Sequence, residues 1–88
     1  MNSAQYIVQA ERFLWRVGKI FPSGDTAYQA VLAYAVTVAR WATLGETADA
    51  EARMMEEFAM NAADAATTPA RRAAYDYAAL LYHRARNS

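Results

Sequence analysis

Two sets of side chains have residue types and a spacing that could bind another macromolecule. Each set combines two apolar or aromatic residues seven positions apart with two flanking cations. The members are Val8, Trp15, Arg12 and Lys19 in the first set and Tyr75, Tyr82, Arg71 and Arg86 in the second. Trp, Tyr and Arg are enriched at interface hot spots, because they bury a large area and donate directed hydrogen bonds. The two sets therefore predict a partner-binding surface.

A structural role for the same rings is the alternative. Tyrosine and tryptophan can close a groove between two helices while their polar tips remain in water. The sequence leaves both interpretations open for Trp15, Tyr75 and Tyr82. Tyr34 and Trp41 belong to a segment that is apolar nearly all round, and we expect these two rings in the core.

Residues that perform catalysis or bind metals are scarce. The chain has no cysteine and one histidine, His83, and its serines lie in a turn or near an end. A hydrolase or transferase usually needs a nucleophile, a base and a group that orients the base. A di-metal site in a bundle uses two Glu-x-x-His pairs, and no Glu precedes His83 by three positions. We therefore expect a non-catalytic protein without catalytic residues, cofactor or metal site.

Charge is balanced over the chain but is unevenly spread along it. Nine Lys and Arg residues oppose nine Asp and Glu residues, which argues against nucleic acid or an anionic membrane as the main partner. Residues 1–24 and 67–88 are net basic, whereas residues 46–66 are net acidic. Charge matching between helices is the expected result. Basic faces on the first and last helices leave nucleic-acid binding as the alternative.

Turn residues divide the chain into four segments that favour helix. Pro22 and Gly24 mark a turn, and Gly45 fits the position just after a helix. Thr68 and Pro69 fit an N-cap followed by the first helical position. Alanine, the strongest helix former, supplies 22 of 88 residues. The predicted helices cover residues 3–20, 26–44, 47–66 and 69–86, with a kinked continuous helix at Thr67–Pro69 as the alternative.

The four predicted segments have matched lengths and short connections. They predict an all-α fold, a compact up-down antiparallel four-helix bundle that forms a single domain over residues 1–88. The last helix is expected to bury one apolar stripe, made of Ala70, Ala74, Tyr77, Leu81 and Ala85. The segment 26–44 has an unusually wide apolar arc, so it is either the central helix or part of a subunit interface.

These patterns predict a non-catalytic protein-interaction module. It would be a small regulator, adaptor or inhibitor that binds a larger protein assembly. Small inhibitors encoded by mobile elements, including those that block nucleic-acid-targeting complexes, fit this description. The alternatives are a homodimeric subunit, joined through residues 26–44 or the groove between the first and last helices, and a nucleic-acid-binding accessory protein. Without cysteine, signal peptide or a bilayer-length apolar run, we expect a cytoplasmic protein with no membrane partner.

Overall fold

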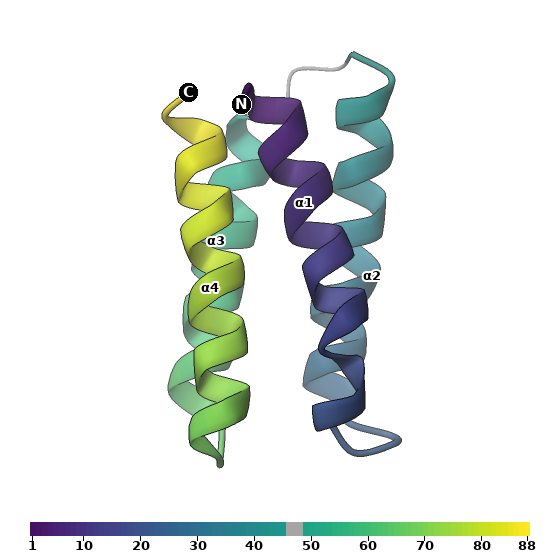
Figure 1. The fold of residues 1–88 in the computed structure, drawn as a ribbon, viewed down its shortest axis with the longest axis vertical. Coiled ribbons are helices and arrows are strands. Elements are labelled where there is room, and N and C mark those ends of the chain that lie inside the picture. Colours follow the sequence, from purple (N-terminus) through teal and green to yellow (C-terminus); the bar gives the residue numbers. More distant parts are fainter. Residues whose placement is uncertain (46–48) are drawn as a thin grey trace.

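The computed structural model describes residues 1–45 and 49–88, which form a bundle of four α-helices. The elements are α1 (Ser3–Arg16), the short 3-10 helix η1 (Gly18–Ile20), α2 (Thr26–Thr43), α3 (Asp49–Ala65) and α4 (Pro69–Arg86). Successive helices run in opposite directions, and both chain ends lie at the same end of the bundle (Figure 1). The predicted all-α four-helix bundle is therefore confirmed. The predicted start of the third helix, at residue 47, lies outside the described residues.

The helix starts follow from side chains that satisfy free backbone N–H groups. At α1, the Asn2 side chain accepts from the Gln5 N–H while the Gln5 side chain accepts from the Asn2 N–H, a reciprocal capping box. At α2, the Asp25 side chain accepts from the Tyr28 N–H. Thr68 caps α4, with Pro69 as its first residue. The break at Thr67–Pro69 is thus a turn between two helices, which excludes the kinked alternative.

Two glycines adopt the left-handed backbone conformation at the predicted turns. Gly24 has φ +87° and Gly45 has φ +82°, values that a residue with a Cβ rarely adopts. Gly24 lies in the turn that joins η1 to α2, and Gly45 follows the end of α2. The turn chemistry inferred from the sequence is confirmed at both positions.

Helix α1 ends four residues earlier than predicted, at Arg16, and continues as η1. The Tyr28 hydroxyl donates a hydrogen bond to the Leu14 carbonyl near this end. Gly18 makes the approach of Tyr28 possible, because a Cβ at Gly18 would lie 2.7 Å from the Tyr28 hydroxyl oxygen. A contact from α2 therefore stabilises the end of α1, which no local pattern in the sequence could indicate.

The core is lined by alanine and filled by a few large side chains. Helix α3 packs most closely against α4, and α1 packs against both α2 and α4. Close approach of α3 and α4 follows from the small residues that they bury, which are Ala52, Ala59, Ala63, Ala74, Ala78 and Ala85. The largest fully buried side chains are Tyr82, Ile7, Leu14, Met55, Leu81, Val31 and Val38.

The buried face of α4 includes Ala74, Leu81 and Ala85 of the predicted stripe but is turned away from Tyr77. Tyr75 and Tyr82 lie in the core, with 3% and 0% of their surface exposed, whereas Tyr77 and Leu80 are exposed. Tyr75 and Tyr82 are buried because their rings are large. Their rings fill space that the alanines of the neighbouring helices leave open.

Two aromatic residues of α2 also lie where the sequence did not predict them. Tyr34 is 51% exposed and Trp41 is 43% exposed, so the expectation that both belong to the core is wrong. The Tyr34 ring touches Phe58 of α3 edge to face, with ring centroids 5.6 Å apart. Helix α2 buries one face, and Tyr34 and Trp41 lie along one edge of that face, where Tyr34 contacts α3.

Candidate functional site

A groove runs along the surface between α1 and α2. It has a volume of about 620 Å³. Helix α1 contributes one wall and α2 the other, and the lining residues are Val8, Glu11, Arg12, Trp15, Val36, Ala39, Arg40, Thr43 and Leu44. We call this feature the α1/α2 groove. Three of the four residues in the first predicted set, Val8, Arg12 and Trp15, therefore meet at one site.

Trp15 is the most prominent ring of this groove. It is 58% exposed, the largest exposed fraction of any aromatic side chain in the described part of the protein. Val8, seven residues earlier on α1, is partly buried and packs against the core. On the opposite wall, Leu44 is also exposed. The groove thus presents apolar side chains that the bundle itself leaves uncovered.

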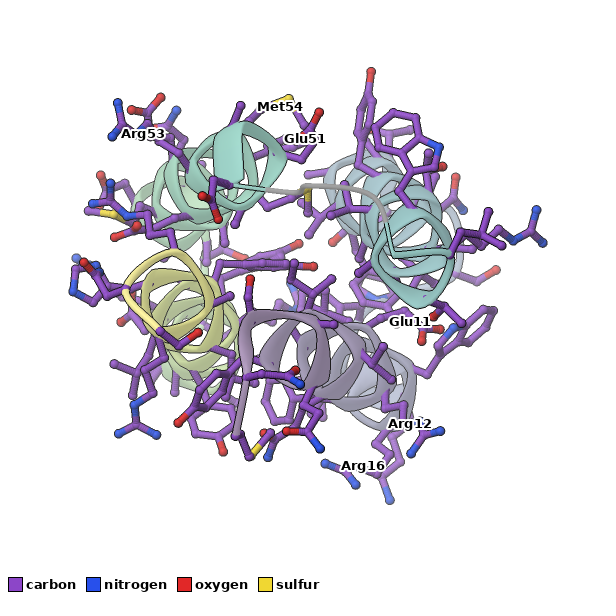
Figure 2. The ribbon with its side chains drawn as sticks, turned by 90° about the horizontal axis from the view of Figure 1, so that it is seen from above. Glu11, Arg12, Arg16, Glu51, Arg53 and Met54 are labelled. Atoms are coloured by element: carbon purple, nitrogen blue, oxygen red, sulfur yellow. The ribbon has the colours of Figure 1, made fainter. Side chains whose placement is uncertain are left out.

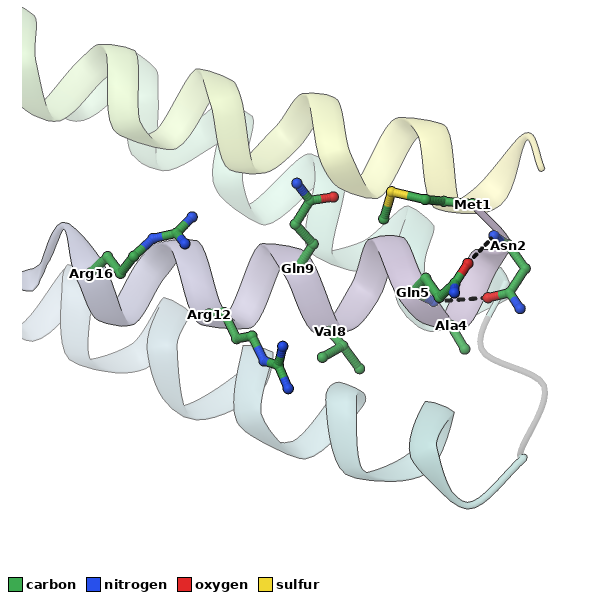
Figure 3. A pocket seen from close by; sticks show the side chains of 8 residues that line it. All are labelled: Met1, Asn2, Ala4, Gln5, Val8, Gln9, Arg12 and Arg16. Atoms are coloured by element: carbon green, nitrogen blue, oxygen red, sulfur yellow. Dashed lines mark hydrogen bonds between the residues drawn. The ribbon is translucent and has the colours of Figure 1, made fainter.

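A second hollow adjoins the groove on the outer side of α1. Figure 3 shows its lining, with Val8 and Arg12 on the side of α1 that faces α2. These two residues also line the α1/α2 groove. Arg16 and the N-terminal residue Met1 complete the hollow at its two ends. The two features therefore form one continuous concave surface along α1.

Positive charge surrounds this surface. Arg12, Arg16 and Arg40 line it, and Glu11 is the one acidic residue among its lining side chains. None of the three arginines makes an ion pair with another residue that the structure describes. Figure 2 shows Arg12 and Arg16 projecting into solvent from the corner of the bundle formed by α1. Lys19, the fourth member of the first set, is exposed on η1, beyond the groove.

The second predicted set does not form an exposed surface. Both of its rings are buried, as described above, and their hydroxyl groups have no hydrogen-bond partner among the described residues. Burial raises the pKa of Tyr75 to about 12, with a further contribution from the charge of Asp25. Burial also raises the pKa of Tyr82, and the charge of Glu11 adds to this shift. Of the two interpretations that the sequence leaves open for Tyr75 and Tyr82, the partner-binding one is wrong, because both rings belong to the core.

The two cations of the second set make contacts within the protein. Arg71 donates from Nε to the Ile20 carbonyl and from Nη1 to the Thr67 hydroxyl, each at 3.2 Å. Arg86 Nε lies 2.6 Å from Glu56 Oε1. These contacts connect α4 to η1, to the preceding turn and to α3, so Arg71 and Arg86 have structural roles.

Helices α3 and α4 match their charges across their interface. Besides Arg86, His83 contacts Glu56, with His83 Nδ1 3.0 Å from Glu56 Oε2. At the other end of the pair, Arg72 lies 3.7 Å from Asp64, and both of these side chains are more than half exposed. Charge matching between helices, expected from the sequence, is confirmed for these residues.

Several lining residues were not singled out in the sequence. Arg40 and Leu44 lie across the groove from Trp15, and Arg16 extends the surface along α1. One signal was available for Arg40, since it is the sole charged residue of α2. The pairing of these residues with Trp15 depends on the packing of α1 against α2, which the sequence does not specify.

Other kinds of site find no support among the described residues. No helix there is long and apolar enough to span a membrane. That part of the chain also contains no group of three or more His, Cys, Asp or Glu side chains arranged to hold a metal ion. Comparisons with protein-family models, with curated proteins and with solved structures find no similar family, protein or structure.

Proposed function

We propose that the protein is a non-catalytic protein-interaction module that binds its partner through the α1/α2 groove. The observation that carries the proposal is the exposed Trp15 ring, which lines a groove beside arginines that make no ion pair within the described structure. Tryptophan and arginine supply most of the binding energy at many protein interfaces. A chain of this size would act as a regulator, adaptor or inhibitor of a larger assembly, and a cysteine-free chain suits the cytosol.

The Trp15→Ala variant tests this proposal. Because Trp15 is mostly exposed, the substitution should leave the free energy of unfolding within about 0.5 kcal/mol of wild type. It should nevertheless abolish recovery of the partner when the protein is affinity-purified from the cells that produce it. Leu80→Ala is the matched control, since Leu80 is an exposed apolar residue of α4 outside the groove. Equal recovery with the wild type and the Trp15→Ala variant would refute the proposal.

Self-association through α2 is a second candidate, favoured by a specific observation. The exposed side of this helix carries Tyr34 and Trp41 and a single charged residue, Arg40. Interface cores are depleted of charge and enriched in aromatic residues. Sedimentation velocity at micromolar concentration would show a dimer of the 9.8 kDa chain that Trp41→Glu dissociates. A monomer at all concentrations would remove this candidate.

Nucleic-acid binding has less support than partner binding through the α1/α2 groove or self-association through α2. The hypothesis needs a basic surface shared by α1 and α4, which do pack side by side. Arg71, Arg72 and Arg86 of α4 are instead engaged in contacts with other parts of the protein. The other exposed cations of the described residues are spread over the bundle and form no basic face shared by α1 and α4. They are Arg12 and Arg16 on α1, Lys19 on η1, Arg40 on α2, Arg53 on α3 and Arg84 on α4.

A further inference from the structure

We infer that the partner of the α1/α2 groove is an acidic amphipathic helix of about three turns. This inference rests on the proposed function and adds the chemistry and shape of the partner. It follows from the charge of the surface, the spacing of the apolar side chains and the length of the groove.

The charge of the surface selects for carboxylates. Arg12 and Arg16 lie on α1 and Arg40 lies on α2, so cations flank the groove on both sides. Glu11 is the single opposing charge in the lining. A partner that places Asp or Glu along both of its edges would form charge-assisted hydrogen bonds with these arginines. A basic partner would be repelled by them.

The apolar side chains set the spacing that the partner must match. Val8 and Trp15 are two helical turns apart on one wall, and Val36 and Leu44 are about two turns apart on the other. A helix that docks into such a groove presents apolar residues at positions i, i+3 or i+4, and i+7. The two walls are therefore suited to a partner with one apolar stripe between two acidic edges.

The length of the concave surface sets the size of the partner. On α1 its lining reaches from Ala4 to Arg16, which is about 18 Å at 1.5 Å per residue. A helix of about 12 residues covers that distance. A short helical segment is thus long enough to contact the arginines and the apolar residues together.

Two other occupants fit the surface less well. A nucleic acid would use the arginines and could stack a base on Trp15, but it would leave Val8, Val36 and Leu44 without apolar contacts. A second copy could bring its acidic α3 to this surface. Glu51 lies on the far side of the bundle from Arg12 (Figure 2), so such head-to-tail contacts would build rings or open chains of copies.

A peptide-display selection tests the inference. A library of helical peptides of about 14 residues, randomised at both apolar and charged positions, is selected on the folded wild-type protein. We expect the enriched peptides to be acidic and to share an apolar i, i+3 or i+4, i+7 pattern. Their binding is then measured by isothermal titration calorimetry, which serves every variant. In the Trp41→Phe variant, Trp15 is the one remaining tryptophan, and its fluorescence reports contact with the peptide.

Variants of single residues separate the contributions. Arg12→Glu and, separately, Trp15→Ala should each weaken binding of the enriched peptides at least about tenfold, which corresponds to roughly 1.4 kcal/mol. Arg84→Glu is the matched control, because Arg84 is an exposed cation of α4 outside the groove, and its effect should stay within about twofold. Circular dichroism confirms that each variant is folded. Trp15→Phe, which keeps an aromatic ring, should bind with intermediate affinity.

The other outcomes contradict either the acidic helical partner or the proposed function itself. Enriched peptides that depend on Trp15 but are neutral or basic would overturn the acidic partner and leave the proposed function standing. If no enriched peptide depends on Trp15, the proposed function itself fails. Tighter binding of a 20-nucleotide single strand or duplex, lost in Arg12→Glu, would identify a nucleic-acid partner instead. Concentration-dependent growth in sedimentation, reversed by Arg12→Glu, would identify a second copy as the occupant.

Discussion

The hydroxyl group of Tyr28 links α2 to the end of α1. It donates to the Leu14 carbonyl. A Cβ atom at position 18 would lie 2.7 Å from the Tyr28 hydroxyl oxygen, which is closer than van der Waals contact. Gly18→Ala should therefore break this hydrogen bond or displace the Tyr28 ring. We expect the variant to lose about 1–2 kcal/mol of its free energy of unfolding, measured by urea denaturation.

A double-mutant cycle checks the cause of that loss. Tyr28→Phe removes the hydroxyl with which the new methyl group would clash, at the cost of leaving the Leu14 carbonyl without this donor. The double variant Gly18→Ala/Tyr28→Phe should then be less destabilised than the sum of the two single variants. Strict additivity would show that the close approach of Gly18 and Tyr28 does not determine the effect.

The buried tyrosines make the protein sensitive to alkali. Burial raises the pKa of Tyr75 from its ordinary value of 10 to about 12, and it also raises the pKa of Tyr82. Above pH 10 the unfolded chain therefore releases protons that the folded protein still holds. The stability that these neutral tyrosines contribute is complete below pH 10 and is lost as the pH rises toward 12.

Urea denaturation between pH 8 and 11.5 measures this effect. The unfolding midpoint should fall above pH 10, and Tyr75→Phe should make the fall less steep. At pH 7, Tyr82→Phe should be neutral or stabilising by up to about 1 kcal/mol, because it removes a buried hydroxyl that has no partner among the described residues. A large loss of stability at pH 7 would show that the Tyr82 hydroxyl makes a contact absent from the structure.

At the scale of the elements, two carboxylates of α3, Glu56 and Asp64, form ion pairs of different strength with α4. Glu56 is 13% exposed and contacts both His83 and Arg86, whereas Asp64 and Arg72 are largely in solvent. Glu56→Gln should cost about 1–3 kcal/mol of unfolding free energy, because it leaves partly buried Arg86 without its counter-charge. Asp64→Asn, the matched control, should cost less than about 0.5 kcal/mol. Equal effects would mean that burial does not strengthen the Glu56 contacts.

The elements themselves could be predicted because their limits depend on local chemistry. The turn at Gly24, the stop at Gly45 and the start at Thr68 and Pro69 each follow from the conformational preference of the residue concerned. The end of α1 is the exception. It depends on Tyr28, which lies 14 residues after its partner Leu14.

Which face of a helix is buried was harder to predict than where the helix lies. Helix α4 is rich in apolar residues on several sides, so two different stripes, one through Tyr77 and one through Tyr75 and Tyr82, both satisfy the helical period. Packing in the core decides between them, where the Tyr75 ring lies 5.2 Å from the Phe21 ring, centroid to centroid. Helix α2 is also apolar on several sides, so the sequence did not show that Tyr34 and Trp41 are exposed. For this reason one of the two sets predicted to bind a partner was built around Tyr75 and Tyr82, which lie in the core.

At the scale of the whole molecule, a net charge of zero conceals a polarised surface. Arg12 and Arg16 of α1 lie across the bundle from Glu51 of α3 (Figure 2), and α3 carries more acidic than basic residues. Such a field attracts an acidic partner before contact. The association rate of an acidic peptide with the α1/α2 groove should therefore fall about tenfold between low and high ionic strength, with a smaller change in its dissociation rate. Stopped-flow Trp15 fluorescence would measure both rates, and a salt-independent association rate would contradict electrostatic attraction.

Both ends of the chain lie together at one end of the bundle (Figure 1), and Met1 borders the second hollow. A fluorescent protein or affinity handle fused before Met1 would therefore crowd the concave surface along α1. Circular permutation avoids this: a short linker would join the present ends, and new ends would open between Ser23 and Gly24, in the exposed turn at the far end of the bundle. Handles attached there would leave the hollow beside Met1 uncovered.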